Sequence, residues 1–501
     1  MSVVTVALGQ AGNQVGASFF ETLAAHESGR NSRCFFRTST ARDGIVVPRA
    51  VLVDTEPKVV QAIVARPTRV ARAAAPSGRR SRLEPSSAAT AAITLRYDLM
   101  QTYCRQSGSA NNWAFGFRVH GPLCWAHPAR AQGISGGRGT ASRALAAQLR
   151  RAAADGPALS SSAVWNEDSA RVSELVRREV ERCDEFEGFL VLQSAAGGTG
   201  SGVGTFATRA LRDEYRTAFI CNALIWPFAA GEVIVQNYNC ALALAHVANA
   251  SDAVIVLEND AIGSVARRLL RLESPTFSAL NGVIARQLAS VFLPTRARGS
   301  GGRVQRRGIL ADPIRHLCAH PGYKLLGLKL TPTMPASSHA FSQTSWPSLA
   351  KQLRQMQLVD SHLDDEQLSW RVDLESSADS RISRCVATWA TLRGDGAEES
   401  ATAQLVDELW AHPRIYAPWA TRTRAALRST REHFGGYERV ASALSNSQGA
   451  IAPVARCVAK AREMFSSGAY VHQYEMHGVE PAAFTDAFRQ LDQIVLNYKS
   501  I

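Results

Sequence analysis

Apolar runs that end in polar or glycine-rich turns recur along the chain and predict strands followed by loops. The apolar run at residues 188–193 follows a strongly charged stretch, residues 181–187, and predicts a buried strand. A glycine-rich turn, residues 194–204, comes directly after it. Apolar positions then recur at helical spacing, which predicts a helix over residues 205–215. The predicted order is strand, glycine loop, helix.

Three more apolar runs end in polar turns, at residues 2–8, 50–54 and 218–226. In a sheet of largely parallel strands such turns lie at one edge, which is where α/β proteins bind their ligands. The pattern therefore predicts an α/β fold with a parallel sheet and a ligand site at the carboxyl ends of the strands.

The glycine-rich turn has the features of an anion site. Backbone N–H groups at a helix N-terminus lack internal partners and carry partial positive charge, and glycines let a phosphate approach the backbone. The turn has no Lys-Ser/Thr pair, so it is not a GxxxxGK[ST] phosphate loop, and Gly9, Gly12 and Gly16 miss the dinucleotide fingerprint. Phosphate would be held by the backbone, without a lysine. A tight turn with no ligand is the alternative.

The 501-residue chain has 46% hydrophobic residues, a globular composition with room for two or three domains. No apolar run approaches the ~18 residues of a membrane span and no cationic signal region opens the chain, so we expect a cytoplasmic protein. The nine cysteines form no CxxC pair and no His/Cys cluster, which argues against a zinc site or a disulfide framework. We expect these cysteines to be reduced.

The net charge of +13 raises the question of a nucleic-acid partner. Much of the excess positive charge lies in two segments. Residues 66–84 hold six arginines and one acidic residue, and residues 123–163 hold five arginines and one acidic residue. Both are poor in aromatic residues and lack steady periodicity, which favours flexible insertions near 66–96 and 123–163. No DNA partner is expected. An RNA- or membrane-surface-binding protein that uses these arginines is the rival hypothesis.

Five motifs carry a resemblance to a known family: GQAGNQVG, VDTEPK, GSANNWAFG, AGGTGSG and LENDAI. In this order they resemble the tubulin superfamily, and AGGTGSG matches its phosphate-loop signature. Residues 225–239 and 470–480 resemble the delta branch rather than the alpha or beta subunits. The resemblance implies a tubulin-like fold with a parallel-sheet GTP-binding domain (1–274), a core helix (275–294), an intermediate α/β domain (295–439) and C-terminal helices (440–501).

The resemblance implies a site for GTP or GDP with Mg²⁺. Asp54 and Glu56 match the acidic turn that holds magnesium through water, and oxygen ligands suit that cation. Asn259 and Asn281 match the two asparagines that read the guanine edge, and an amide can both donate and accept. The other matches lie in the first loop and in the loops around the phosphates: Gln10, Ala11, Gln14, Ala110, Asn111, Asn112, Ser194, Gly197, Gly198, Thr199 and Gly200.

Two positions depart from the family pattern. The glutamate that contacts ribose is Gln236 here, and the aromatic residue that stacks on guanine is Phe277 where the alpha subunit has tyrosine. An uncharged amide should bind a hydroxyl more weakly, and we expect nucleotide binding to survive. Taken alone, several matches also fit simpler roles: Asn111 and Asn112 as a turn, Asn281 as a polar position on a core helix, and the two acids as a helix N-terminus.

The resemblance also implies that any GTP hydrolysis requires assembly, because in tubulins the next subunit supplies an acid from the loop after its core helix. Counting back from the motif CAHP, residues 318–321, gives Asp312 as that acid. An acid can orient water and accept its proton, although Asp is one methylene shorter than Glu. Two alternatives stay open: Asp312 caps a helix that begins at Pro313, or the chain is a structural tubulin that binds GTP without hydrolysing it.

The last segment, Pro481–Lys499, predicts a helix with an apolar stripe that packs on the body of the protein. Its apolar positions are spaced three and four apart: Phe484, Phe488, Leu491, Val495 and Tyr498. The chain ends without the acidic tail usual in tubulins, so motor docking through such a tail is not expected. The resemblance implies a tubulin of the cytoskeleton, located at centrioles, basal bodies and cilia, that forms or maintains triplet microtubules with other tubulins and centriole components as partners.

Overall fold

The computed structural model describes residues 1–26, 34–38, 45–65, 67–72, 92–125, 171–231, 233–294, 297–298, 304–305, 308–335, 337–338, 344–363, 382–420 and 425–501. Within these ranges, no helix combines the length and the apolar character that crossing a lipid bilayer requires. All nine cysteines fall in these ranges, and none of them forms a disulfide.

Ten strands form the main sheet: β1 Ser2–Leu8, β4 Ala50–Asp54, β7 Thr102–Cys104, β8 Phe186–Ser194, β9 Phe219–Trp226, β10 Ala253–Glu258, β13 Leu325–Thr331, β14 Cys385–Gly394, β15 Ala425–Thr430 and β16 Arg439–Ser447. Their order is β15-β14-β16-β13-β10-β9-β8-β1-β4-β7. Every pair from β7 to β13 is parallel, whereas β16 is antiparallel to both of its neighbours. The predicted α/β fold with a parallel sheet is confirmed, and each of the predicted apolar runs forms a strand.

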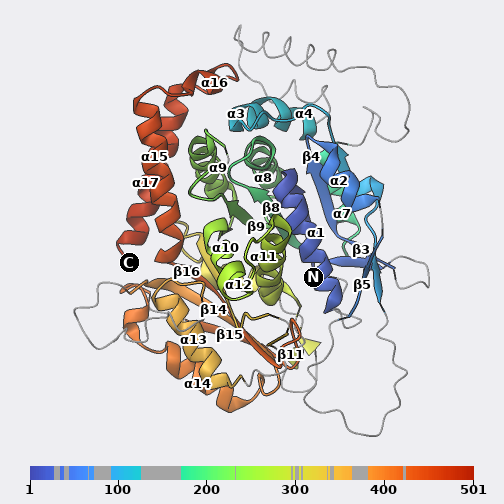
Figure 1. Cartoon of the computed structure of the whole chain (residues 1–501), viewed down its shortest axis with the longest axis vertical. Coiled ribbons are helices and arrows are strands. Elements are labelled where there is room, and N and C mark those ends of the chain that lie inside the picture. Colours follow the sequence, from blue (N-terminus) through green and yellow to red (C-terminus); the bar gives the residue numbers. More distant parts are fainter. Residues whose placement is uncertain are drawn as a thin grey trace.

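Side chains of the parallel strands alternate between two apolar layers, because successive residues of a strand point to opposite faces. In β8, Leu190 and Leu192 belong to the core that includes helices α1 (Gly9–Ala25) and α11 (Phe277–Phe292). Phe189 and Val191 belong to the core that includes α7 (Val172–Glu181) and α8 (Gly204–Glu214). Helices therefore cover both faces of the sheet (Figure 1).

The core helix α11 lies within the segment where the sequence predicts it. Its first turn is capped by Thr276, whose hydroxyl accepts from the Ala279 N–H at 3.3 Å. It packs against α1 and against α10 (Asn259–Arg268). At its other end, the buried Arg393 of β14 donates to the Ser290 carbonyl at 2.9 Å and also to the Leu293 carbonyl. These bonds attach the strands of the expected intermediate domain to the core helix.

Helices cover the two ends of the molecule (Figure 1). The lower end in that view carries α13 (Trp346–Leu358) and α14 (Ser400–Trp410), and the short α12 (Ala311–Leu317) lies nearer the parallel strands. Along one side, α15 (Ile451–Ser466) and α17 (Pro481–Lys499) pack on α9 (Gln236–Ala250). The predicted stripe on the last helix is confirmed, because all five of its apolar residues are buried.

A small second sheet has the order β2-β3-β6-β5, formed by Phe36–Thr38, Ile45–Pro48, Ile93–Leu95 and Thr68–Val70. Strands β5 and β6 are the described ends of the first arginine-rich segment, and they pair antiparallel with each other. Residues 73–91 of that segment lie outside the described residues. So do residues 126–163 of the second segment, which follow α4 (Gly121–Trp125).

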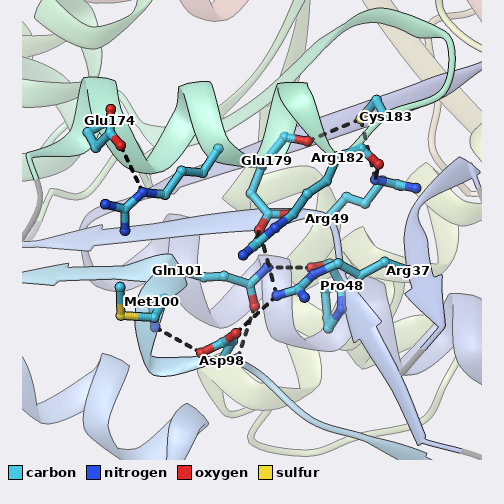
Figure 2. A network of polar contacts seen from close by, with 11 residues as sticks. Arg37, Pro48, Arg49, Asp98, Met100, Gln101, Glu174, Glu179, Arg182 and Cys183 are labelled. Carbon is cyan, nitrogen blue, oxygen red and sulfur yellow. Dashed lines mark hydrogen bonds and ion pairs between the residues drawn. The ribbon is translucent and has the colours of Figure 1, made fainter. Parts of the chain in front are cut away.

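A network of charged and polar side chains joins α7 to the small sheet (Figure 2). Glu179 of α7, with a side chain only 1% exposed, lies 2.6 Å from Arg182 and 3.7 Å from Arg37. Arg37 also pairs with Asp98 at 3.2 Å. Asp98 and Gln101 cap the 3-10 turn Leu99–Gln101 reciprocally, and Gln101 donates to the last carbonyl of β3 at 2.6 Å. Two cations therefore compensate the buried Glu179 carboxylate.

Candidate nucleotide site

The glycine loop, the start of α1 and the turn before α3 (Trp113–Phe115) pack together at the carboxyl ends of β1 and β8. Gly9 has a φ of 71°, and a Cβ there would lie 2.8 Å from the Gly200 nitrogen. A Cβ at Gly198 would lie 2.3 Å from the Ser109 carbonyl oxygen. Only glycine permits both approaches. The glycines are thus required for the packing of these three segments, and the approach of a phosphate to the loop stays a prediction.

The backbone of the glycine loop remains open at Gly197, where an added Cβ would meet only Asn111 Oδ1, at 4.0 Å. After it, residues Thr199–Val203 form one turn of π-helix that runs into α8. The Ser194 hydroxyl accepts from the Ala196 N–H at 3.2 Å, which fixes the start of the loop. We call this surface the phosphate cradle: residues 194–200 together with the first turn of α1. Its geometry suits an anion held by backbone N–H groups.

Two residues that the sequence analysis missed, Thr55 and Ser109, join Thr199 in a hydroxyl trio. The Thr55 hydroxyl lies 3.1 Å from that of Ser109 and 2.5 Å from that of Thr199. The third side, from Thr199 to Ser109, is 3.1 Å. The trio connects the turn after β4, the turn before α3 and the glycine loop. Hydroxyl side chains give no motif on their own, so only the structure brings these three together.

The acidic turn after β4 presents two different carboxylates. Asp54 Oδ1 accepts from the N–H groups of Thr55 at 2.8 Å and Glu56 at 3.3 Å, and burial raises the pKa of Asp54 to about 6. Asp54 Oδ2 is buried without a hydrogen-bond partner. Glu56 is exposed, and it faces Gly108, whose added Cβ would lie 3.6 Å from Glu56 Oε1. Glu56 precedes α2 (Pro57–Val64), but its side chain does not cap that helix.

These carboxylates fit a hydrated Mg²⁺ better than a cation enclosed by protein ligands. No group of three or more His, Cys, Asp or Glu side chains in the described part of the chain is arranged to hold a metal ion. Mg²⁺ commonly keeps several waters and binds one or two carboxylates together with nucleotide phosphates. The unpartnered oxygen of Asp54 and the exposed oxygens of Glu56 form a donor set of that kind.

In the turn before α3, some residues are exposed at the site and others support the fold. Ala110 and Asn111 are exposed and have left-handed backbone, with φ of 47° and 50°. Asn112 is buried, and its side chain caps α3 by accepting from the N–H groups of Ala114 and Phe115 at 2.8 and 3.2 Å. The predicted turn is therefore present. The Asn112 side chain supports it, and Asn111 lies toward the glycine loop.

A further residue missed from the sequence, Asn239 of α9, holds this turn in place. It is fully buried, and its side-chain nitrogen donates to the carbonyls of Asn111 at 2.8 Å and Ala196 at 2.6 Å. Its side-chain oxygen accepts from the Trp113 N–H at 2.9 Å and the Tyr474 hydroxyl at 2.6 Å. All four hydrogen bonds of the amide are made. One side chain thus connects two loops of the site to the C-terminal helices.

On the side expected to hold the base, the structure brings together residues from distant segments. Asn281 of α11 donates to Gln14 Oε1 at 3.3 Å. Phe277, the first residue of α11, is 53% exposed, and its ring lies 6.4 Å from that of Phe228. Gln236 donates to the Phe228 carbonyl at 3.1 Å, while its Oε1 is buried without a partner. The exposed Phe277 ring offers an open face for stacking.

Three predicted residues remain at the rim of this group. Gln10, in the first turn of α1, is exposed, and Ala11 beside it is partly buried against the core. Asn259 is the first residue of α10 and is partly exposed. One turn later in α10, a Cβ at Gly263 would lie 3.5 Å from the Phe228 ring, so this helix start is close to Phe228.

Asp312 lies away from the phosphate cradle, at the opposite edge of the sheet. It is in the first turn of α12, and its carboxylate lies 3.5 Å from the buried guanidinium of Arg428. The helix begins at Ala311, two residues before the predicted start at Pro313. Its cap comes from Glu187 near the start of β8, which accepts from three successive N–H groups at 2.6–3.0 Å. The helix cap that was expected from Asp312 is thus supplied by Glu187 of strand β8.

Comparisons with known proteins agree with this architecture. The Tubulin/FtsZ family, GTPase domain, matches residues 2–127 and 163–267. The chain is 34% identical to the tubulin delta chain of Macaca fascicularis over 99% of both chains, and 34% identical to that of Mus musculus over 100% of both. It is 23% identical to a tubulin beta-1 chain of Chondrus crispus, over 99% of this chain and 93% of the relative. The chain therefore belongs to the tubulin family of GTP-binding proteins, in which it is more similar to these delta chains than to this beta chain.

Proposed function

We propose that the chain binds GTP or GDP with Mg²⁺ at the phosphate cradle and acts, with other tubulins, in assembling or maintaining the triplet microtubules of centrioles and basal bodies. The observation that carries the nucleotide site is the convergence of the α1 start, the glycine loop and the turn before α3, each fitted to the next by close backbone approaches. The similarity to tubulin delta chains supports the delta-type role.

The roles of individual residues follow from their positions in the site. Backbone N–H groups of the phosphate cradle bind the phosphates, and Asp54 and Glu56 hold Mg²⁺ through water. The ion would supply the positive charge that offsets the phosphates beside two carboxylates. Phe277 stacks on the base, and Asn281 reads its edge together with Asn259. Gln236 offers its unpartnered Oε1 to a sugar hydroxyl, without the charge assistance of a glutamate.

The test is to denature the purified full-length protein and measure the released nucleotide. We expect near-stoichiometric guanine nucleotide, because the cradle and the base-side residues are already assembled. Asn281→Ala should reduce the nucleotide recovered roughly tenfold, since one buried hydrogen-bonding group is lost. Asn249→Ala, which changes an exposed asparagine at the end of α9, is the matched control. A folded protein that carries no nucleotide and takes up no added GTP would contradict the proposal.

The centriolar role is tested separately in cells. A tagged chain is expected at centrioles or basal bodies, and its removal is expected to leave doublet or singlet microtubules where triplets form. Normal triplets in cells that lack the protein would refute this role and leave nucleotide binding untouched.

A further inference from the structure

Tyr474 of the short helix α16 (Val471–Glu475) is connected to the nucleotide site through the buried amide of Asn239. We propose that Asn239 and Tyr474 are positioning residues that make the order of α16 depend on whether a nucleotide occupies the phosphate cradle. This inference rests on the proposed function and adds a nucleotide-dependent element to that site. Its basis is a chain of hydrogen bonds that runs from the glycine loop to α16 through one side chain.

The chain of hydrogen bonds begins at the peptide unit between Ala196 and Gly197. Asn239 Nδ2 donates to the Ala196 carbonyl at 2.6 Å. A trans peptide unit is planar and its N–H points opposite to its carbonyl, so a bond that fixes this carbonyl also fixes the direction of the Gly197 N–H. Gly197 is the open position of the phosphate cradle, where an added Cβ would meet only Asn111 Oδ1, at 4.0 Å. Asn239 therefore orients one of the N–H groups that bind phosphate in the proposed function.

The amide of Asn239 responds as a unit because all four of its hydrogen bonds are made. Nδ2 also donates to the Asn111 carbonyl at 2.8 Å, and Oδ1 accepts from the Trp113 N–H at 2.9 Å and the Tyr474 hydroxyl at 2.6 Å. Asn239 and Tyr474 are both 0% exposed, so water does not compete for these bonds. Hydrogen bonds in a chain polarise one another. A phosphate on the cradle therefore strengthens the bond from the glycine loop to the amide, and the amide then binds Tyr474 more strongly.

The order of α16 depends on such contacts because the helix is only five residues long, and a helix this short has little stability of its own. Two further contacts join its segment to the turn before α3 and to α3 itself. The Asn112 side-chain nitrogen donates to the Gln473 carbonyl at 3.2 Å. The ring of His477 stacks on Phe115, with centroids 4.6 Å apart. The segment lies near α3 at the upper end of the molecule in Figure 1, and Met476 is 65% exposed. A change at the site loops therefore reaches an exposed surface.

The experiment measures backbone hydrogen exchange in residues 469–480 of the purified full-length chain, first with its nucleotide removed and then with GTP and Mg²⁺ added. We expect GTP to slow exchange there roughly tenfold in the wild type, within the usual range for two coupled sites. Tyr474→Phe, which removes a single oxygen, should reduce this slowing about fivefold, the effect of one lost hydrogen bond. Because coupling is reciprocal, its affinity for GTP and for GDP should fall by about the same factor.

The matched control is Tyr238→Phe, which removes a hydroxyl that holds the same segment from α9. The Tyr238 hydroxyl donates to the Ala469 carbonyl at 3.0 Å, so this bond does not pass through Asn239. Exchange in residues 469–480 should become faster in this variant both with and without GTP. The ratio of the two rates should stay at roughly tenfold, and nucleotide affinity should change less than about twofold.

The outcomes separate this inference from the proposed function on which it rests. A wild type that binds GTP but exchanges these residues equally fast with and without it would overturn the inference and leave the proposed function standing. So would an undiminished GTP effect in Tyr474→Phe, or an equal loss of the effect in Tyr238→Phe. A wild-type chain that takes up no guanine nucleotide would overturn the proposed function, and the inference with it. The wild-type comparison needs no variant, so the test does not depend on how well the variants fold.

Discussion

The buried His246 of α9 makes the stability of the protein depend on pH. Its ring stacks on Trp113, with centroids 5.3 Å apart and planes 7° apart, and on Phe117 at 5.5 Å. Burial, with Arg209 and Arg118 nearby, lowers the pKa of His246 to about 4. The folded state therefore keeps this imidazole neutral at a pH where the unfolded chain, with a pKa of about 6.5, is already protonated.

The sign of the effect follows from this difference. As pH falls from about 6.5 to about 4, the unfolded state takes up a proton that the folded state does not, so the free energy of unfolding decreases. We expect His246 to account for about 3 kcal/mol of this loss. Urea denaturation of His246→Gln over this pH range should show a shallower slope than the wild type. The exposed His320→Gln is the control, and an equal slope in His246→Gln would contradict the prediction.

At the scale of single residues, the sequence identifies the site residues whose role depends on backbone conformation. Gly9, Gly198 and Gly200 are visible because a glycine run after an apolar run is typical of a tight loop at a strand end. Thr55 and Asn239 are not, because their partners lie far along the chain: Thr55 meets Thr199 144 residues away, and Asn239 meets Tyr474 235 residues away. Their residue types are common at many unrelated positions. Only the packed structure brings each of them to its partner.

Among the elements, α12 is held by a strand distant in sequence. Glu187 of β8 accepts from the N–H groups of Ile309 and Leu310, which directly precede the helix, and of Ala311, its first residue. A carboxylate at a helix N-terminus is also favoured by the helix dipole. The sequence places the helix start at Pro313 with a local cap. The real start is earlier because the cap comes from 122–124 residues away.

Replacing Glu187 should therefore weaken the whole junction between β8 and α12. We expect Glu187→Ala to reduce the free energy of unfolding by about 2–4 kcal/mol, since it leaves buried N–H groups unsatisfied. Glu187→Gln keeps one acceptor oxygen and should cost less. Glu181→Gln, which removes an exposed ion pair with Arg177, should leave the unfolding midpoint nearly unchanged. Guanidinium unfolding midpoints measure all three. Equal midpoints for Glu187→Ala and Glu181→Gln would show that the cap contributes little.

At the scale of the whole molecule, the order of motifs predicts the fold class, and side-chain contacts decide how the parts are joined. The sequence divides the chain into a GTP-binding part, a core helix, an intermediate part and C-terminal helices, and these bounds stay a prediction. In the structure, β10, β13 and β16 are neighbours in one sheet, which continues without a break from the GTP-binding part into the intermediate part. Periodicity cannot reveal this, because the link between the two parts is the parallel pairing of β10 with β13, in which Val254 lies opposite Leu325.

The same sheet separates Asp312 from the phosphate cradle of its own chain. β8 begins beside Glu187, which caps the helix that carries Asp312, and it ends at Ser194, where the phosphate cradle starts. Asp312 therefore cannot act on the nucleotide of its own chain, because the full length of a nine-residue strand lies between them. In a head-to-tail assembly, the end that carries Asp312 would face the cradle of the neighbouring subunit. Arg428, at 3.5 Å, fixes the direction of the Asp312 carboxylate.

The last prediction is that Asp312 supports GTP hydrolysis on a neighbouring subunit. In a polymer assembled with other tubulins, we expect Asp312→Ala to slow phosphate release from the neighbour at least roughly tenfold, because the group that orients water and accepts its proton is lost. The nucleotide bound to the variant itself should be unchanged, since Asp312 lies far from that cradle. Asp312→Glu, which keeps the carboxylate, should retain activity and so serves as the control. Unchanged phosphate release from an Asp312→Ala polymer would exclude this residue from hydrolysis and favour a structural subunit that binds GTP without turning it over.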